Sequence, residues 1–160
     1  MGRHKESDII LECLVRENPD DHRLLHNWGA VKRMLGQYQE ALKIFEKEKT
    51  MIQEHGDALS IATNEYELGK TYHMLENYEA ALRHASRSFL MSQKCDDLIM
   101  HGCAYRLLGD LYSSYCKEVG LAFYSQAKNC FSRGMDPRAV EDMEQRIECV
   151  KNGKDPKFVS

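Results

Sequence analysis

Residues 67–82 read ELGKTYHMLENYEAAL, and this stretch returns in altered form 40 residues earlier and 40 residues later. The earlier copy is NWGAVKRMLGQYQEAL from residue 27, and the later copy is LLGDLYSSYCKEVGLA from residue 107. Gly29, Gly69 and Gly109 recur at the same phase, and so do Tyr38 and Tyr78. Self-similarity at a fixed period of this length is typical of solenoid proteins built from stacked modules.

Each copy has the pattern of two helices joined by a turn. Leu68, Tyr72 and Leu75 follow the spacing of one helix face, and Tyr78 and Leu82 begin a second face after the turn. Extending this pattern along the chain predicts helices over residues 5–17, 21–35, 38–54, 57–75, 78–94, 97–116, 119–133 and 137–151. Asp residues stand where several of these helices begin, as expected of N-caps.

Glycines at one phase of the repeat have a geometric explanation. Two antiparallel helices approach closely only where a side chain is nearly absent, so we expect Gly69 and Ala81 at the helix crossing. The predicted organisation is an N-terminal helix that resembles half a repeat (1–18), three hairpin repeats (19–56, 57–95 and 96–134), a capping helix (135–152) and a frayed tail (153–160).

Composition agrees with an all-α fold and narrows the function. Only 10 glycines and 3 prolines interrupt 160 residues, which disfavours an all-β fold with its frequent turns. A net charge of −3 gives no reason to expect nucleic acid or an anionic membrane as partner, and no apolar run is long enough to cross a bilayer. Six scattered cysteines without a CxxC pair predict small buried thiols in a reducing compartment. We therefore expect a cytoplasmic protein, with the nucleus left open.

The W/L-G-x-x-Y…G-x-Y-x-x-A…F pattern over residues 19–133 resembles the tetratricopeptide repeat family. The resemblance implies a right-handed superhelical solenoid of antiparallel hairpins with a capping helix, whose first helices line a concave groove. The 40-residue period is similar to a subgroup found in spindle-orientation adaptors with GoLoco motifs. That subgroup often has asparagine where this chain has Ala30, Lys70 and Asp110, so its ligand is not carried over.

The resemblance also implies which side chains face the groove. They are Arg23, His26, Asn27, Arg33, Tyr66, Lys70, His73, Arg106 and Asp110. Counting Glu67 with them, the groove carries four basic and two acidic side chains, which favours an acidic and hydrophobic peptide as ligand. Ordinary solvated helix faces are the alternative reading of the same residues. The positions of the family's chaperone-tail clamp read His26, Ala30, Glu67, Cys103 and Leu107, so a co-chaperone is not expected.

The sequence has incomplete candidates for a metal site and no catalytic motif. His22 and His26 have metal-ligand spacing, as do His101 and Cys103, but neither pair has a third ligand nearby in sequence. No Gly-rich phosphate loop, HExxH motif or nucleophile elbow is present. We therefore predict no enzyme, no metal and no cofactor.

A charge run on one second helix, Lys43, Glu46, Lys47, Glu48 and Lys49, is expected to be a solvated outer face. The predicted function is a protein–protein interaction scaffold or adaptor that binds a partner's peptide in its groove. The alternative is a self-assembling structural subunit, a homo-oligomer that forms through the N-terminal helix and its Ile9-Ile10-Leu11 segment.

Overall fold

The computed structural model describes residues 2–156, apart from the side chains at 2, 54 and 55. The chain is 82% helical, and the described residues contain eight helices and no strand. The helices are α1 (Gly2–Glu17), α2 (His22–Met34), α3 (Tyr38–His55), α4 (Ala58–Met74), α5 (Tyr78–Ser92), α6 (Leu98–Tyr112), α7 (Lys117–Arg133) and α8 (Pro137–Lys151). The predicted all-α fold is confirmed.

Aspartate caps start the four helices that follow inter-hairpin turns. Asp21, Asp57, Asp97 and Asp136 each accept a hydrogen bond from a backbone N–H in the first turn of α2, α4, α6 and α8. Pro137 follows Asp136 at the first position of α8, where its missing N–H costs nothing. These local signals explain why the helix starts were predictable within a few residues.

The end of α6 differs from the prediction. The periodic pattern extends this helix to residue 116, but it ends at Tyr112. The hydroxyls of Ser113 and Ser114 donate to the carbonyls of Asp110 and Leu111, both at 3.2 Å, and such bonds compete with helix continuation. A turn of four residues therefore separates α6 from α7 and carries Tyr115.

Close approach of paired helices depends on the recurring glycines, as expected. A Cβ atom on Gly69 would lie 3.4 Å from the carbonyl oxygen of Ala81 and 2.8 Å from a methyl carbon of Leu107. On Gly29 it would lie 2.6 Å from the ring of Phe45. The ring of Phe45 therefore leaves no room for a side chain on Gly29, whereas on Gly69 a side chain would displace the flexible end of Leu107. The glycines allow the helices to approach this closely.

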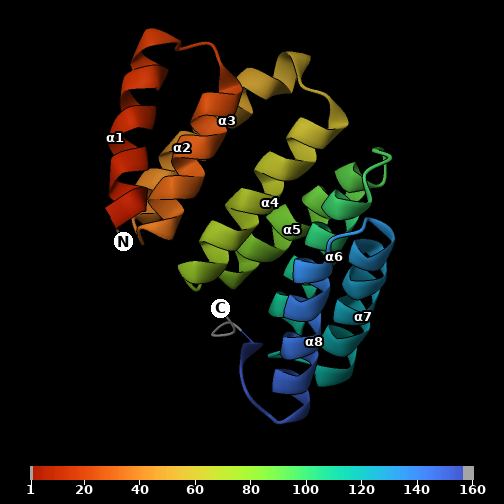
Figure 1. The fold of residues 1–160 in the computed structure, drawn as a ribbon. Helices are drawn as coiled ribbons and strands as arrows, with labels where there is room; N and C mark the ends of the chain where they lie inside the picture. Colours follow the sequence, from red (N-terminus) through yellow and green to blue (C-terminus); the bar gives the residue numbers. More distant parts are fainter. Residues whose placement is uncertain (1, 157–160) are drawn as a thin grey trace.

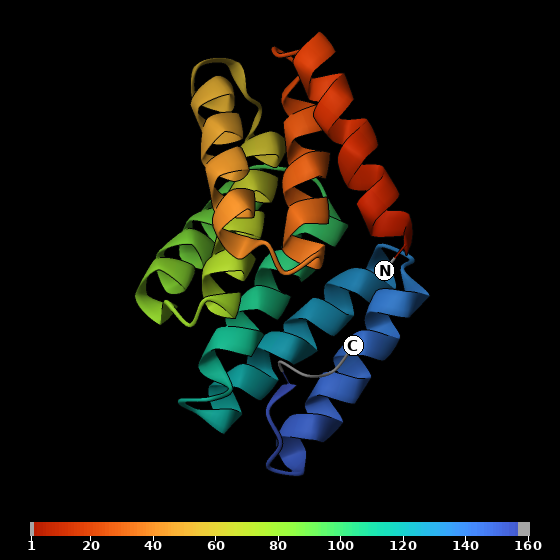
Figure 2. The ribbon, with the colours of Figure 1, turned by 90° about the vertical axis from the view of Figure 1, so that its left-hand side faces the viewer.

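The helices form one curved array in which sequence neighbours pack together (Figure 1). The pairs α2/α3, α4/α5 and α6/α7 are antiparallel hairpins, while α1 packs on α2 and α8 packs on α7. Figure 2 shows α1 and α8 on the same side of the array. A carboxylate attaches α1 to α2, since Asp8 accepts hydrogen bonds from Trp28 Nε1 at 2.8 Å and Lys32 Nζ at 2.9 Å.

Two smaller expectations were wrong. The segment after α8 is not frayed up to residue 156, because Pro156 is buried and its carbonyl accepts a hydrogen bond from Arg146; residues 157–160 lie outside the described part. The cysteines are free, but of the six only Cys130 is buried and Cys13 is exposed. No helix in residues 2–156 combines the length and the apolar character needed to cross a bilayer.

Candidate functional site

The first helices of the hairpins, together with α8, make one continuous face. Helix α2 contacts α4, and α4 contacts α6. Ion pairs and hydrogen bonds connect the four helices. Arg33 of α2 pairs with Glu67 of α4 at 2.8 Å, and Arg106 of α6 donates to the hydroxyl of Tyr66 on α4. Arg106 also pairs with Asp142 of α8 at 3.2 Å, and Arg146 of α8 pairs with Asp110 of α6 at 2.6 Å. We call this surface the groove face, because two pockets hollow it.

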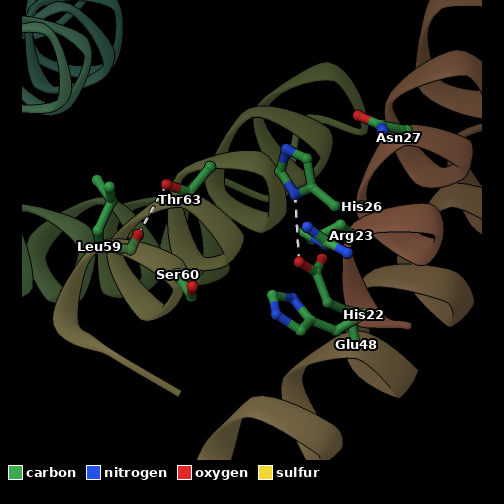
Figure 3. Close-up of a pocket in the computed structure, with 8 residues that line it drawn as sticks. All are labelled: His22, Arg23, His26, Asn27, Glu48, Leu59, Ser60 and Thr63. Carbon is green, nitrogen blue, oxygen red and sulfur yellow. Dashed lines mark hydrogen bonds and ion pairs between the residues drawn. The ribbon is translucent and has the colours of Figure 1, made fainter. Parts of the chain in front are cut away.

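The N-terminal pocket lies between α2 and α4 and has a volume of about 310 Å³ (Figure 3). It is lined by His22, Arg23, His26, Asn27, Glu48, Leu59, Ser60 and Thr63. Three predicted groove residues, Arg23, His26 and Asn27, are therefore brought together. Figure 3 shows the carboxylate of Glu48 reaching in from α3 between the two histidine rings.

Glu48 is a site residue that was not predicted from the sequence. It belongs to the charge run expected to be solvated, yet it is 2% exposed. Its carboxylate lies 3.2 Å from Nδ1 of His26 and accepts a hydrogen bond from the Asn64 amide at 2.8 Å. The signal was present in the periodicity, because Glu48 shares a helix face with Ala41, Phe45 and Ile52, whereas Glu46 does not.

The His26–Glu48 pair gives the pocket a pH dependence near neutrality. Burial lowers the pKa of His26, but the hydrogen bond and charge of Glu48 outweigh burial, so the pKa is raised above its ordinary value of about 6.5. Protonated His26 therefore stabilises the fold below about pH 6.5, and this contribution is lost as pH rises through the higher folded-state value.

We expect a His26→Gln variant to show this directly. Relative to the variant, wild type should lose free energy of unfolding as the pH is raised from about 6 to about 8. Urea unfolding of both proteins across that range measures the difference. A constant difference would contradict the assigned contact between His26 and Glu48.

The C-terminal pocket lies between α4, α6 and α8 and has a volume of about 560 Å³. Four predicted groove residues, Tyr66, Lys70, Arg106 and Asp110, line it together with Asp136, Arg138, Ala139, Asp142 and Arg146. The ring of Tyr66 is buried beneath two cations, with Lys70 Nζ 4.7 Å and the Arg106 guanidinium 5.8 Å from its centroid. The attraction of Tyr66 raises the pKa of Arg106, which stays charged.

Helix α8 contributes residues to this pocket that were not predicted. Asp142 pairs with Arg106, and Arg146 pairs with Asp110. The repeat spacing could have predicted them. Asp142 and Arg146 stand 39 residues, about one repeat, after Cys103 and Leu107, which are the groove-facing clamp positions of α6. Treating α8 only as a polar cap hid the fact that it continues the groove face.

Arg33 and His73, the two remaining predicted residues, lie outside both pockets. Arg33 and Lys70 both pair with the buried carboxylate of Glu67, at 2.8 and 3.3 Å. Burial raises the pKa of Glu67, but the two cations outweigh it and the net shift is downward. His73 is buried at the end of α4, with its ring 5.8 Å from that of Tyr78.

The charge balance of the groove face is smaller than the sequence suggested. Its basic residues are Arg23, Arg33, Lys70, Arg106, Arg138 and Arg146, and its acidic residues are Glu48, Glu67, Asp110, Asp136 and Asp142. The surplus of positive charge falls from two to one. The residues that the structure adds to the predicted set are two basic side chains, Arg138 and Arg146, and three acidic ones, Glu48, Asp136 and Asp142. Arg138 is exposed and has no carboxylate within ion-pair distance among residues 2–156.

Within the described residues, no three His, Cys, Asp or Glu side chains are grouped so that they could hold a metal ion. His22 and His26 share only Glu48 in their pocket.

Comparison with known proteins agrees with this geometry. Residues 20–94, which include α2 to α5, match the family model described as tetratricopeptide repeat. No curated protein matches the chain. The match supports a tetratricopeptide repeat family over these two hairpins, and the all-α architecture of the chain is consistent with a helical repeat solenoid of that type. Tetratricopeptide repeats generally mediate protein–protein interaction and are typically non-catalytic scaffolds.

Proposed function

We propose that the protein is a non-catalytic scaffold whose groove face binds an extended or helical peptide segment of a partner protein. The observation that carries this proposal is the continuity of the groove face, in which four helices present polar side chains around two pockets. A bound segment gains main-chain and side-chain hydrogen bonds from such a surface, and the pockets receive its larger side chains.

An acidic and hydrophobic segment suits the surface best. Arg138 offers positive charge at the C-terminal pocket and has no internal ion-pair partner in the part of the chain that the structure describes, and Lys70 beside it shares its charge with Glu67. Apolar contact is available from Leu59, which lines the N-terminal pocket and is 38% exposed. A peptide that places a carboxylate near Arg138 and an apolar side chain near Leu59 would contact both pockets.

We also infer the finer organisation of the chain. Residues 19–56, 57–95 and 96–134 are taken as the three repeats, and α8 extends their groove rather than only capping it. The 40-residue period keeps the spindle-orientation adaptors with GoLoco motifs as the nearest subgroup, with a different ligand because of Ala30, Lys70 and Asp110. A cytoplasmic adaptor fits these features.

Selection from a displayed library of short linear peptides tests the proposal. Peptides enriched on wild type should contain Asp or Glu next to large apolar residues. Their affinity should fall about tenfold, or ~1.4 kcal/mol, in a Lys70→Glu/Arg138→Glu double variant, because the two new carboxylates repel the acidic residues of the peptide.

A Lys43→Glu variant is the matched control, since Lys43 is exposed on α3 away from both pockets. Fluorescence anisotropy with a labelled enriched peptide measures all three proteins. Enrichment of basic peptides, or equal affinity for the double variant and wild type, would contradict an acidic ligand in the groove.

Self-association through α1 is a second candidate function. Ile9 and Ile10 are 65% and 58% exposed, although α1 is held firmly on α2 by Asp8. Adjacent exposed isoleucines on a fixed helix are a surface that a partner would cover.

A further inference from the structure

An apolar pocket of about 190 Å³ lies outside the groove face, between the start of α5 and the end of α6. We call it the aromatic pocket; it is lined by Tyr78, Glu79, Leu82, Leu111, Tyr112 and Tyr115. Tyr115 is 72% exposed and stands edge-on to Tyr78, with ring centroids 6.3 Å apart. Tyrosines that combine apolar rings with free hydroxyls are enriched where proteins contact one another.

The chain itself shows that this pocket is unusual. At the equivalent place one repeat earlier, Leu42 and Leu75 replace Leu82 and Tyr115. There Leu42 is 9% exposed and Leu75 packs against the same core cluster, so the space is closed. In the later repeat Leu82 is 36% exposed, because the early end of α6 places Tyr115 on the turn.

Glu79 is the charged residue among those that line the aromatic pocket, and it is exposed. An apolar floor beside a carboxylate fits a large aliphatic side chain that has a basic residue next to it.

Helix α1 carries such a group on its outer surface. At 100° per residue, Lys5, Ile9 and Arg16 fall along one line of the helix, and all three are exposed. Arg16 contacts only Glu12 of its own helix, in an exposed pair that costs little to exchange. Ile9 of one molecule therefore suits the aromatic pocket of another in its apolar character and in the charge of the neighbouring Lys5.

We propose that the aromatic pocket receives Ile9 of a second copy of the chain, with Lys5 of that copy beside the carboxylate of Glu79. This rests on the second proposed function, self-association through α1, and names the surface that α1 contacts. The two contacting surfaces are different, so a pair of copies keeps one free α1 surface and one free pocket. Such an arrangement adds further copies unless a ring closes.

Sedimentation velocity over a range of concentrations tests the proposal with four proteins. Wild type should show a mass that keeps rising with concentration. Ile9→Asp and Tyr115→Ser should each weaken association at least tenfold, because each removes one of the two surfaces. Leu90→Asp, at an exposed leucine of α5, is the control and should behave as wild type.

Mixing the two variants gives the decisive result. The Ile9→Asp protein keeps its pocket and the Tyr115→Ser protein keeps its α1 surface, so an equimolar mixture should form a one-to-one dimer. Circular dichroism confirms that each variant is folded. Wild-type protein that stays monomeric at every concentration would contradict self-association altogether. Undiminished association of Tyr115→Ser, or absence of the mixed dimer, would leave self-association standing and overturn the aromatic pocket as its partner surface.

Discussion

Replacing Gly109 with valine is expected to lower the free energy of unfolding by about 3 kcal/mol or more. A Cβ at this position would lie 2.6 Å from two ring carbons of Tyr124. That ring is fully buried, and its hydroxyl donates to Asp110 at 2.7 Å, so it cannot move aside without breaking a hydrogen bond. Overpacking and the lost bond add together, and urea unfolding measures the sum.

Ser86→Val is the matched control, because it places valine at an exposed position inside α5. The control reports the intrinsic cost of a β-branched residue in a helix, which is below about 1 kcal/mol. Equal losses in the two variants would show that Gly109 is tolerated rather than required at the crossing of α6 and α7.

Glu65→Gln is expected to cost about 3 kcal/mol at neutral pH, since it removes the buried carboxylate that Lys49, Arg87 and the ring of His84 contact. Glu65 is 1% exposed, and its carboxylate lies 2.6 Å from His84, 3.3 Å from Lys49 and 3.2 Å from Arg87. Urea unfolding of wild type and variant measures the loss. Glu46→Gln, on the exposed face of α3, is the control and should be nearly neutral.

The same pair of proteins should respond differently to acid. Burial raises the pKa of Glu65, but His84, Lys49 and Arg87 outweigh it, so the net shift is downward. A lowered folded-state pKa stabilises the fold above the unfolded value of about 4.3, and this contribution disappears as pH falls through the folded value. The stability difference between wild type and Glu65→Gln should therefore shrink on acidification. A difference that grows instead would contradict the assigned charge state.

Local rules made much of this fold predictable. The recurring glycines gave the helix crossings, and the aspartate caps gave the starts of α2, α4, α6 and α8. Helix crossings and helix starts depend on residues close in sequence or on the repeat itself, so the periodic pattern is enough to predict them. The end of α6 was missed because two serine hydroxyls compete with the backbone after Tyr112, a local effect that the repeat pattern conceals.

The groove face was predictable only in part, because its electrostatics depend on contacts between repeats. Arg33 and Lys70 were expected to attract a ligand, yet both pair with Glu67. Likewise Arg106 is paired by Asp142 of α8, a partner 36 residues away that only the stacking of α6 and α8 brings near. Arg138, which no groove prediction included, is the more accessible cation.

The central claim is that the groove face binds a partner's peptide. Amide chemical-shift changes in the labelled protein, recorded while an enriched peptide is added, test this claim most directly. If the groove face binds the peptide, the largest changes should occur at α2, α4, α6 and α8, around Thr63, Lys70 and Arg138. Changes confined to α3, α5 and α7, with these groove amides unmoved, would contradict it.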